Sequence, residues 1–474
     1  MTRRNISCLL LAWALACFGP AHPASAQQNR QPNRQGQGGV NLPQTMKRYE
    51  TRYYVVYSDL DPEDVKDVAL RMTRMAEEYY ERTKTFSGKI RQKFPFYLFK
   101  DAEDYYAAGA PVGSAGVFMV RGHEARLMAI AGERGGGSSA HVVQHEGFHQ
   151  FAHAVIGGDI PMWVNEGLAE YFGESVFTGD GFVTGVVPPG RMKRVQEKIK
   201  GKQFKSVKNM MLLTNRDWNA GLSINNYDQA WSMVHFLAHG DNGAYQKPFT
   251  QFMNDIGRRK PWQDAWQANF GSADGFEKKW ADWWLSRPPN PTADLYARAT
   301  VATLTSYLGR LAAQKQTFGD LAAFVRAAEA GEVKLPLNDD WLPPGLLQDA
   351  IAWLGRDKNV EFAIESEAAA TPAPADAKAA KPAKSAREAK VIKPPRVVAT
   401  LPDKTRLVGS YNPKAATGRV TVEVDDLVTV LEKAKGLIAD QKKDQARVLL
   451  QDALKRVPRS PLAEDAKKLL LQAK

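Results

Sequence analysis

The segment from His145 to Glu170 constrains this chain more than any other, because it joins a His-Glu-x-x-His pattern to a second acidic segment. Residues four apart share one face of a helix, so His145 and His149 can aim two imidazole nitrogens at one metal ion while Glu146 stands beside it. Glycines and serines precede the pattern and Gly157-Gly158 follows it, as at the start and end of a helix. The sequence therefore predicts a helix with the pattern at its centre.

The third metal ligand decides between classes of site, since a catalytic zinc usually takes three protein ligands and keeps one position for water. The long metzincin signature would place Gly and His three and six residues after the second histidine, where Ala152 and Val155 stand. The other common arrangement takes a glutamate from the next helix, which is Glu166 here. Glu170, one turn later on the same face, is placed to accept a hydrogen bond from a ligating imidazole. The predicted Zn²⁺ ligands are therefore His145, His149 and Glu166.

These residues resemble the gluzincin metallopeptidases, and within them the bacterial peptidase-MA-like proteins related to the thermolysin and aminopeptidase families. The likeness rests on His-Glu-x-x-His and on Trp163-x-Asn165-Glu166-Gly167-x-Ala169-x-Tyr171, whose Asn-Glu-Gly step looks like the segment that supplies the third ligand in aminopeptidase-type members. A third block is Tyr227-Asp228-Gln229-Ala230, and the likeness over the rest of residues 46–290 is weak. The resemblance implies a zincin-like domain that hydrolyses peptide bonds.

In those peptidases, the helix matching the third block starts with a tyrosine that steadies the tetrahedral intermediate, so the resemblance implies this role for Tyr227. Aminopeptidases of the group also carry Gly-x-Met-Glu-Asn on the strand before the zinc helix, with a glutamate that holds the free amine. Neither Gly116–Val120 nor Ala125–Ile130 contains it. An endopeptidase is therefore expected rather than an exopeptidase.

The expected mechanism follows from charge. Zinc lowers the pKa of an adjacent water toward ~7, so Glu146 can accept its proton as general base and later pass it to the leaving amine. Tyr227 would donate a hydrogen bond to the oxygen that becomes negative. The resemblance also implies that an extended substrate pairs with a sheet edge beside the metal, for which Arg126–Ile130 is the candidate strand.

Several nearby residues have ordinary structural alternatives. His141 and His153 continue the four-residue spacing, but a helix surface or packing position is favoured and neither is predicted as a ligand. His235, two turns after Tyr227, either lines the cleft or packs in the core, and Tyr227 itself has the alternative of a core tyrosine. The helical spacing of Trp280, Trp283 and Trp284 favours packing over carbohydrate stacking.

Residues 1–26 have the features of a secretory signal, with two arginines, a short apolar run and Ala24-Ser25-Ala26 before the expected cleavage. We therefore expect an exported protein, periplasmic or extracellular. No transmembrane anchor is expected, because no later run reaches ~18 apolar residues. Both cysteines, Cys8 and Cys17, lie in this segment, which leaves histidines and carboxylates as metal ligands of the mature chain.

The net charge of +12 would suit a nucleic-acid partner, but its distribution argues against a specific one. Seven basic residues stand against two acidic ones between residues 368 and 396, in an Ala/Pro/Lys-rich run that cannot bury a core. An extended tether is predicted there, with weak attraction to acidic envelope polymers as the alternative.

Composition divides the chain into six parts. The predicted parts are a signal at 1–26, a disordered linker at 27–45, a zincin-like domain at 46–290, a helical extension at 291–365, the linker at 366–396 and a small C-terminal domain at 397–474. The fold class is α+β, with a small mixed-sheet lobe beside a helical lobe. The last part ends in a helical hairpin like one tetratricopeptide unit, which is too short for a solenoid and would dock a protein partner or cap another domain.

Two functions from different classes stay open. The first is an exported zinc endopeptidase acting on peptide or protein substrates. The second is a catalytically silent envelope scaffold that uses a zincin-like fold as a binding surface. Glu146 beside a full ligand set favours the first, since a scaffold has no physical need for a general base.

Overall fold

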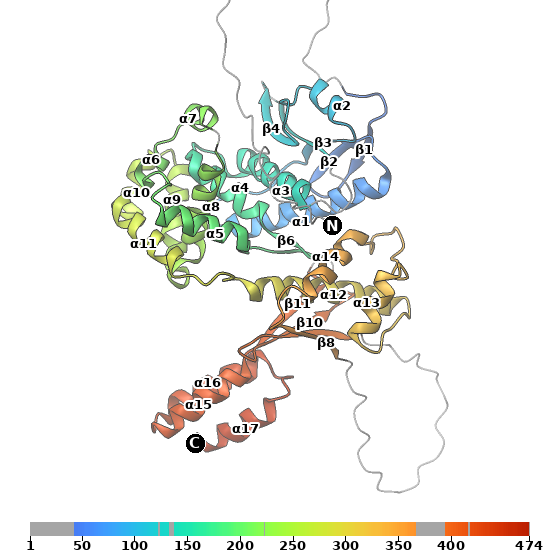
Figure 1. Cartoon of the computed structure of the whole chain (residues 1–474), viewed down its shortest axis with the longest axis vertical. Helices are drawn as coiled ribbons and strands as arrows, with labels where there is room; N and C mark the ends of the chain where they lie inside the picture. The colour runs from blue at the N-terminus through green and yellow to red at the C-terminus, as the bar shows by residue number, and fades with distance from the viewer. Residues whose placement is uncertain are drawn as a thin grey trace, which may run out of the picture. The chain divides into compact units, whose positions relative to one another are not determined.

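The computed structural model describes residues 42–121, 124–131, 137–221, 223–365, 394–415 and 418–473. They form two compact units, and both are mixtures of helices and small sheets, which confirms the predicted α+β class (Figure 1). The first unit runs to Ser175 and resumes from Thr184 to Thr292, while the second takes Val176–Val183 and everything from Ala293 onward. The predicted signal, most of the first predicted linker and nearly all of the second lie outside the described residues. None of the described helices is long and apolar enough to cross a membrane.

A five-stranded mixed sheet forms one part of the first unit, in the order β1-β2-β3-β5-β4. Its strands β2, β3 and β5 are parallel, and β1 and β4 are antiparallel edges. The strands are β1 (Lys47–Glu50), β2 (Tyr54–Ser58), β3 (Phe94–Phe99), β4 (Gly116–Arg121) and β5 (Glu124–Ile130). The prediction that Arg126–Ile130 forms the sheet edge is wrong, because that segment is the inner strand β5 and the edge is β4.

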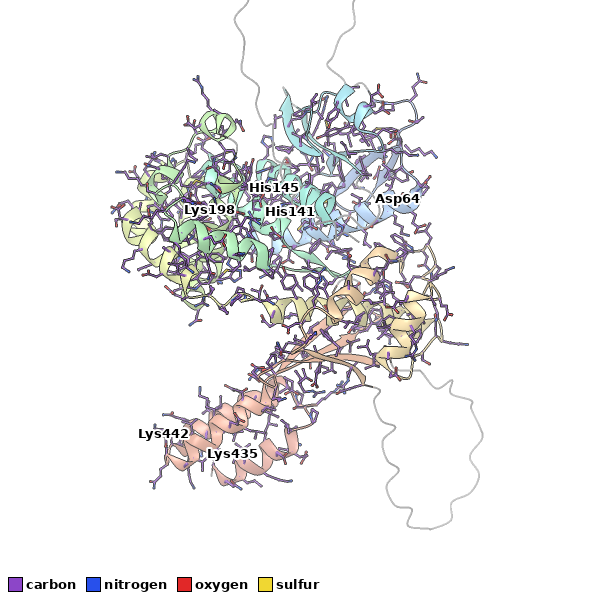
Figure 2. All side chains as sticks on the ribbon, in the orientation of Figure 1. Asp64, His141, His145, Lys198, Lys435 and Lys442 are labelled. Atoms are coloured by element: carbon purple, nitrogen blue, oxygen red, sulfur yellow. The ribbon has the colours of Figure 1, made fainter. Side chains whose placement is uncertain are left out.

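The helices of this unit are α1 (Pro62–Thr83), α2 (Ala102–Ala107), α3 (Gly137–Phe151), α4 (Met162–Gly173), α5 (Pro189–Lys200), α6 (Val207–Met211), α7 (Asn215–Ala220), α8 (Ile224–His239), α9 (Gln246–Gly257), α10 (Trp262–Phe270) and α11 (Ala273–Leu285). Helix α3 is the one predicted around the histidine pattern, and it carries His141 and His145 (Figure 2). The indole nitrogens of Trp280 and Trp284 on α11 donate to Ser232 on α8, at 3.2 and 3.0 Å. Both tryptophans are buried, so they pack in the core as expected.

Helices α4 and α8 lie unusually close, and Gly167 is the reason. A Cβ at this position would meet Val234 Cγ2 at 2.5 Å and the backbone oxygen of Ala230 at 2.6 Å. Only a residue without a side chain allows this contact, since protein interiors have no room to spare. Gly167 follows Glu166 directly, so the close approach of the two helices is set beside a predicted metal ligand.

The second unit contains a four-stranded antiparallel sheet in the order β11-β10-β9-β8. Its elements are the hairpin β6 (Val176–Phe177) and β7 (Phe182–Val183), the helices α12 (Ala293–Ala313), α13 (Leu321–Glu329) and α14 (Pro344–Leu354), the strands β8 (Glu361–Glu365), β9 (Arg396–Thr400), β10 (Arg406–Tyr411) and β11 (Val420–Asp425), and the helices α15 (Leu427–Ala439), α16 (Lys443–Arg456) and α17 (Ala463–Gln472). Residues 291–365, predicted as helical, thus contain three helices followed by the strand β8. This strand pairs with β9, which follows it in the chain after residues 366–393. The chain closes with three helices that share a small apolar core, where the sequence predicted a hairpin.

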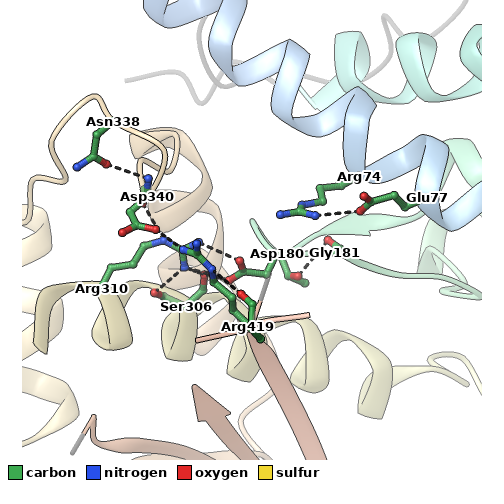
Figure 3. A network of polar contacts seen from close by, with 11 residues as sticks. Arg74, Glu77, Asp180, Gly181, Ser306, Arg310, Asn338, Asp340 and Arg419 are labelled. Atoms are coloured by element: carbon green, nitrogen blue, oxygen red, sulfur yellow. Dashed lines mark hydrogen bonds and ion pairs between the residues drawn. The ribbon is translucent and has the colours of Figure 1, made fainter. Parts of the chain in front are cut away.

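A buried ion pair anchors the β6–β7 hairpin within the second unit (Figure 3). Asp180 in the hairpin turn contacts Arg310 of α12 at 2.9 Å, and both side chains are about 95% buried. Ser306, one turn earlier on α12, donates to the same carboxylate at 2.5 Å. The guanidinium also lies 5.5 Å from the ring centre of Tyr411 on β10. The hairpin, α12 and the second sheet therefore meet at one arginine.

Candidate metal centre

His145, His149 and Glu166 converge inside the first unit. The Nε2 atoms of the two histidines are 3.1 Å apart, and the Glu166 oxygens lie 3.4 Å from His145 Nε2 and 3.6 Å from His149 Nε2. All three side chains are buried. One ligand atom from each lies within 4.8 Å of the others, so the three residues could hold a metal ion.

Local sequence explains how these three side chains meet. The two histidines lie one turn apart on α3, which continues into a π-helical turn, Ala152–Ile156, and ends where Gly157 adopts φ 67°. The chain then enters α4 at Pro161 and presents Glu166 in its second turn. The side-chain amide of Gln144, next to His145, donates to the carbonyls of Phe172 and Gly173 at the end of α4 and of Ser175 just beyond it, at 3.0–3.1 Å. These bonds fasten α4 to α3 beside the ligands.

The nitrogen and oxygen atoms of this site are arranged better for binding a cation than for hydrogen bonds to one another. Glu166 Oε2 is buried near the two imidazoles without a well-aligned hydrogen bond. Burial alone would raise the pKa of the Glu166 carboxyl, but the neighbouring His149 and His145 lower it to about 2. Burial would lower the pKa of the His145 imidazole, yet Glu166 and Glu170 raise it well above its usual value. Two imidazoles and one carboxylate are the donor set of open catalytic metal sites.

Glu170 lies behind His145, where the sequence analysis predicted it. Its Oε1 is 3.1 Å from His145 Nδ1, the nitrogen that faces away from His149. Its Oε2 lies 3.6 Å from His141 Nε2 and 2.6 Å from Arg191 Nη1. His141, His145 and Glu170 also have metal-binding spacing. A second cation is disfavoured there, because the Arg191 guanidinium already supplies the positive charge next to Glu170.

His153 and His235 take structural positions. His153 is exposed, with its ring 5.6 Å from that of Phe118. His235 is buried with its Nε2 3.1 Å from the backbone oxygen of Gly185, and burial together with the neighbouring His239 lowers its pKa to about 3. It is therefore a neutral core histidine, which is the packing alternative of the sequence analysis.

Glu146 points from α3 toward the edge strand β4. Its Oε2 accepts a hydrogen bond from the backbone N–H of Phe118 at 2.8 Å. Gly116 allows the approach, because a Cβ there would lie 2.4 Å from Val142 Cγ1 and 3.4 Å from Glu146 Cγ. The carboxylate of Glu146, the residue after His145 on α3, is thus hydrogen-bonded to the sheet edge.

Tyr227 lies in the first turn of α8, which Ser223 caps by accepting from the Asn225 backbone N–H. Its ring centre is 6.3 Å from that of His145, and Trp218 of α7 packs perpendicular to it at 5.1 Å. Burial and the nearby Glu166 raise the pKa of Tyr227, so its hydroxyl keeps its proton at any ordinary pH. The structure therefore brings Tyr227 beside the histidine pair as a proton-bearing group.

Sequence reasoning missed Arg191, Asp228 and Trp218. Arg191 occupies an inward position of α5, one turn before Val195 on the apolar stripe, and a basic residue on such a stripe is the signal that could have identified it. Asp228, next to Tyr227, is buried and contacts Arg191 Nε at 2.9 Å. No local pattern marks Trp218, whose role comes from packing alone.

Comparison with known proteins matches one part of the chain to a family without an assigned activity. Residues 139–263 match the model of a family described as a protein of unknown function, DUF1570. This stretch contains all six predicted site residues. No curated protein matches the chain.

Proposed function

We propose that this chain is an exported zinc metallopeptidase of the gluzincin type, which cleaves peptide bonds within polypeptide chains. The observation that carries the proposal is the buried convergence of His145, His149 and Glu166, with Glu146 adjacent and Tyr227 across from His145. Zinc suits a set of two imidazoles and one carboxylate, and the mature chain offers no thiol. The predicted signal places the reaction outside the cytoplasm.

Each protein group then has one task. Zinc held by the three ligands would lower the pKa of water toward ~7 and polarise a carbonyl group. Glu146 takes the proton from that water and delivers it to the leaving amine. Tyr227 donates its hydroxyl proton in a hydrogen bond to the oxygen that gains negative charge, which its raised pKa supports.

The edge strand β4 supports a polypeptide substrate. An extended peptide can add to an exposed sheet edge through backbone hydrogen bonds, which tolerate many side chains. Glu146 already accepts from the Phe118 backbone N–H on this strand, so the base and the sheet edge are adjacent. The strand shows no glutamate placed to hold a free amine, which favours cleavage within chains.

The test is zinc content and proteolysis of an unstructured protein by the mature chain. Wild type should carry about one zinc and cleave, while His149→Ala should lose the metal. His153→Ala is the matched control for metal binding, since that exposed histidine continues the spacing but does not belong to the group formed by His145, His149 and Glu166, and it should keep its zinc.

Two further variants separate metal binding from chemistry. Glu146→Gln should keep the metal and lose about 10²–10⁴-fold in rate, and Tyr227→Phe should keep it and lose about 10²–10³-fold. A wild type without zinc, or a Glu146→Gln variant as fast as wild type, would refute the peptidase. Zinc binding without any proteolysis would favour the silent scaffold.

A further inference from the structure

Arg191 is a buried arginine that contacts Glu170, the carboxylate next to Nδ1 of the predicted metal ligand His145. It lies near the start of α5, and only 5% of its side chain is exposed. Its guanidinium is 4.5 Å from the ring centre of Trp231 on α8. Figure 1 shows α4, α5 and α8 as neighbouring helices, and Arg191 of α5 contacts Glu170 of α4 and Asp228 of α8.

The contacts of Arg191 form a chain that ends on a metal ligand. Its Nη1 lies 2.6 Å from Glu170 Oε2, and the other oxygen of Glu170 is 3.1 Å from His145 Nδ1. Both oxygens of that carboxylate are therefore held. Because Glu170 lies 3.1 Å from His145 Nδ1, the other ring nitrogen, Nε2, is the one directed at His149 and Glu166.

Arg191 is itself fixed on three sides. The same Nη1 contacts Glu174 Oε1 at 2.6 Å, just beyond the end of α4, and Nε contacts Asp228 Oδ1 at 2.9 Å. Asp228 is held in turn by Arg194, at 2.8 and 3.0 Å. A planar guanidinium with several donors in a fixed fork can hold two helices at once, which a lysine ammonium cannot do in the same geometry.

We propose that Arg191 is a positioning residue of the metal centre, which holds Glu170 against His145 and so fixes the ring of that ligand. The inference rests on the proposed function, because it assigns a role toward the metal. A buried ion pair is weak evidence for a stabilising role, since apolar replacements of similar volume are often tolerated. Partners behind a ligating histidine, by contrast, commonly govern metal affinity.

The test compares Arg191→Met with Arg194→Met in the full mature chain. Among the described residues, Arg194 pairs with the same Asp228 carboxylate but not with Glu170, and it is 42% exposed, so it is the matched control. Zinc affinity is measured by competition with a chromophoric chelator, and ligand geometry by the visible spectrum of the Co²⁺-loaded protein. Far-ultraviolet circular dichroism monitors folding.

Arg191→Met should bind zinc about 10- to 100-fold more weakly and change the Co²⁺ spectrum, while Arg194→Met should match wild type. Arg191→Lys should show a smaller loss, because one ammonium can reach Glu170 but not Asp228 as well. If Arg191→Met does not fold, Arg191→Lys and Asp228→Asn carry the same expectation of weakened binding with an altered spectrum.

The outcomes separate the two claims. Folded Arg191 variants with wild-type zinc affinity and spectrum would overturn the positioning role and leave the proposed function intact. If Arg191 only stabilises the fold, its variants should have a lower melting temperature but the zinc affinity and Co²⁺ spectrum of wild type. A wild type that binds neither zinc nor Co²⁺ would overturn both.

Discussion

Replacing Gly167 by alanine tests whether the close packing of α4 against α8 sets the distance between the proposed metal ligands and Tyr227. The new Cβ would meet Val234 Cγ2 at 2.5 Å and Ala230 O at 2.6 Å, where ordinary contact begins at 3.4 Å. Val234 can adjust its rotamer, but Ala230 O belongs to the backbone of α8. Helix α8 must therefore retreat by about 1 Å, and Tyr227, one turn before Ala230, moves with it.

The magnitude combines two opposing effects. Overpacking costs about 1–3 kcal/mol, and a backbone clash belongs at the upper end. Alanine in place of glycine gains about 1 kcal/mol of helix propensity, which leaves a net loss of about 2 kcal/mol in the free energy of unfolding. A displacement of about 1 Å at a catalytic group can cost about 10²-fold in rate.

Urea unfolding, zinc content and proteolysis together check this expectation. Zinc content should stay at the wild-type level, because Gln144 fastens α4 to α3 independently of α8. Gly190→Ala on α5 is the control, since a Cβ there meets nothing within 4 Å, and it should gain about 0.4–1 kcal/mol without affecting turnover. Unchanged stability and unchanged rate in Gly167→Ala would show that the two helices adjust freely and that the reasoning is wrong.

Two further predictions concern stability. Asp180→Asn breaks a buried ion pair and should cost about 3–5 kcal/mol in thermal unfolding, whereas Lys278→Ala, which breaks an exposed pair with Asp282, should cost under about 1 kcal/mol; equal losses would contradict the assigned burial. Burial lowers the pKa of His235 to about 3, against an ordinary 6.5. Between these two pH values the unfolded chain binds a proton that the folded chain does not. The free energy of unfolding should therefore fall as pH falls from 6.5 to about 3, on the order of 4 kcal/mol in total. His235→Gln can still donate to Gly185. In this variant the free energy of unfolding in urea should depend less steeply on pH in acid, by a slope equivalent to up to one proton. An unchanged slope would show that His235 is not the group that takes up this proton on unfolding.

Short-range patterns predicted which side chains lie close together at the candidate metal centre. The four-residue spacing places His145 and His149 on one face of α3 whatever surrounds them. Glu166 and Glu170 repeat that spacing on the next helix, so a single turn between the helices is enough to bring both glutamates to the histidines. These relations depend on helix geometry, which is local in sequence.

Relations that depend on distant pairing were not predictable in this way. The order of β4 and β5 depends on which strand pairs with β3, and both strands have suitable compositions. Strand β8 pairs with a strand that lies beyond residues 366–393, so it looked like the end of a helical segment. Arg191 contacts Glu170 and Asp228, which lie on other helices, and nothing in its own helix specifies those partners.

The β6–β7 hairpin limits where this chain can be cut into fragments and which of its parts can be exchanged in evolution. Since residues 176–183 belong to the second unit, the chain passes between the units after Ser175, Val183 and Thr292 rather than once. A fragment ending at residue 292 would keep Asp180 but lose Arg310, leaving a carboxylate that is buried in the whole protein without its arginine. Genetic exchange that swaps the region after residue 292 for an unrelated sequence would meet the same obstacle, so the two units are expected to descend together as one heritable block.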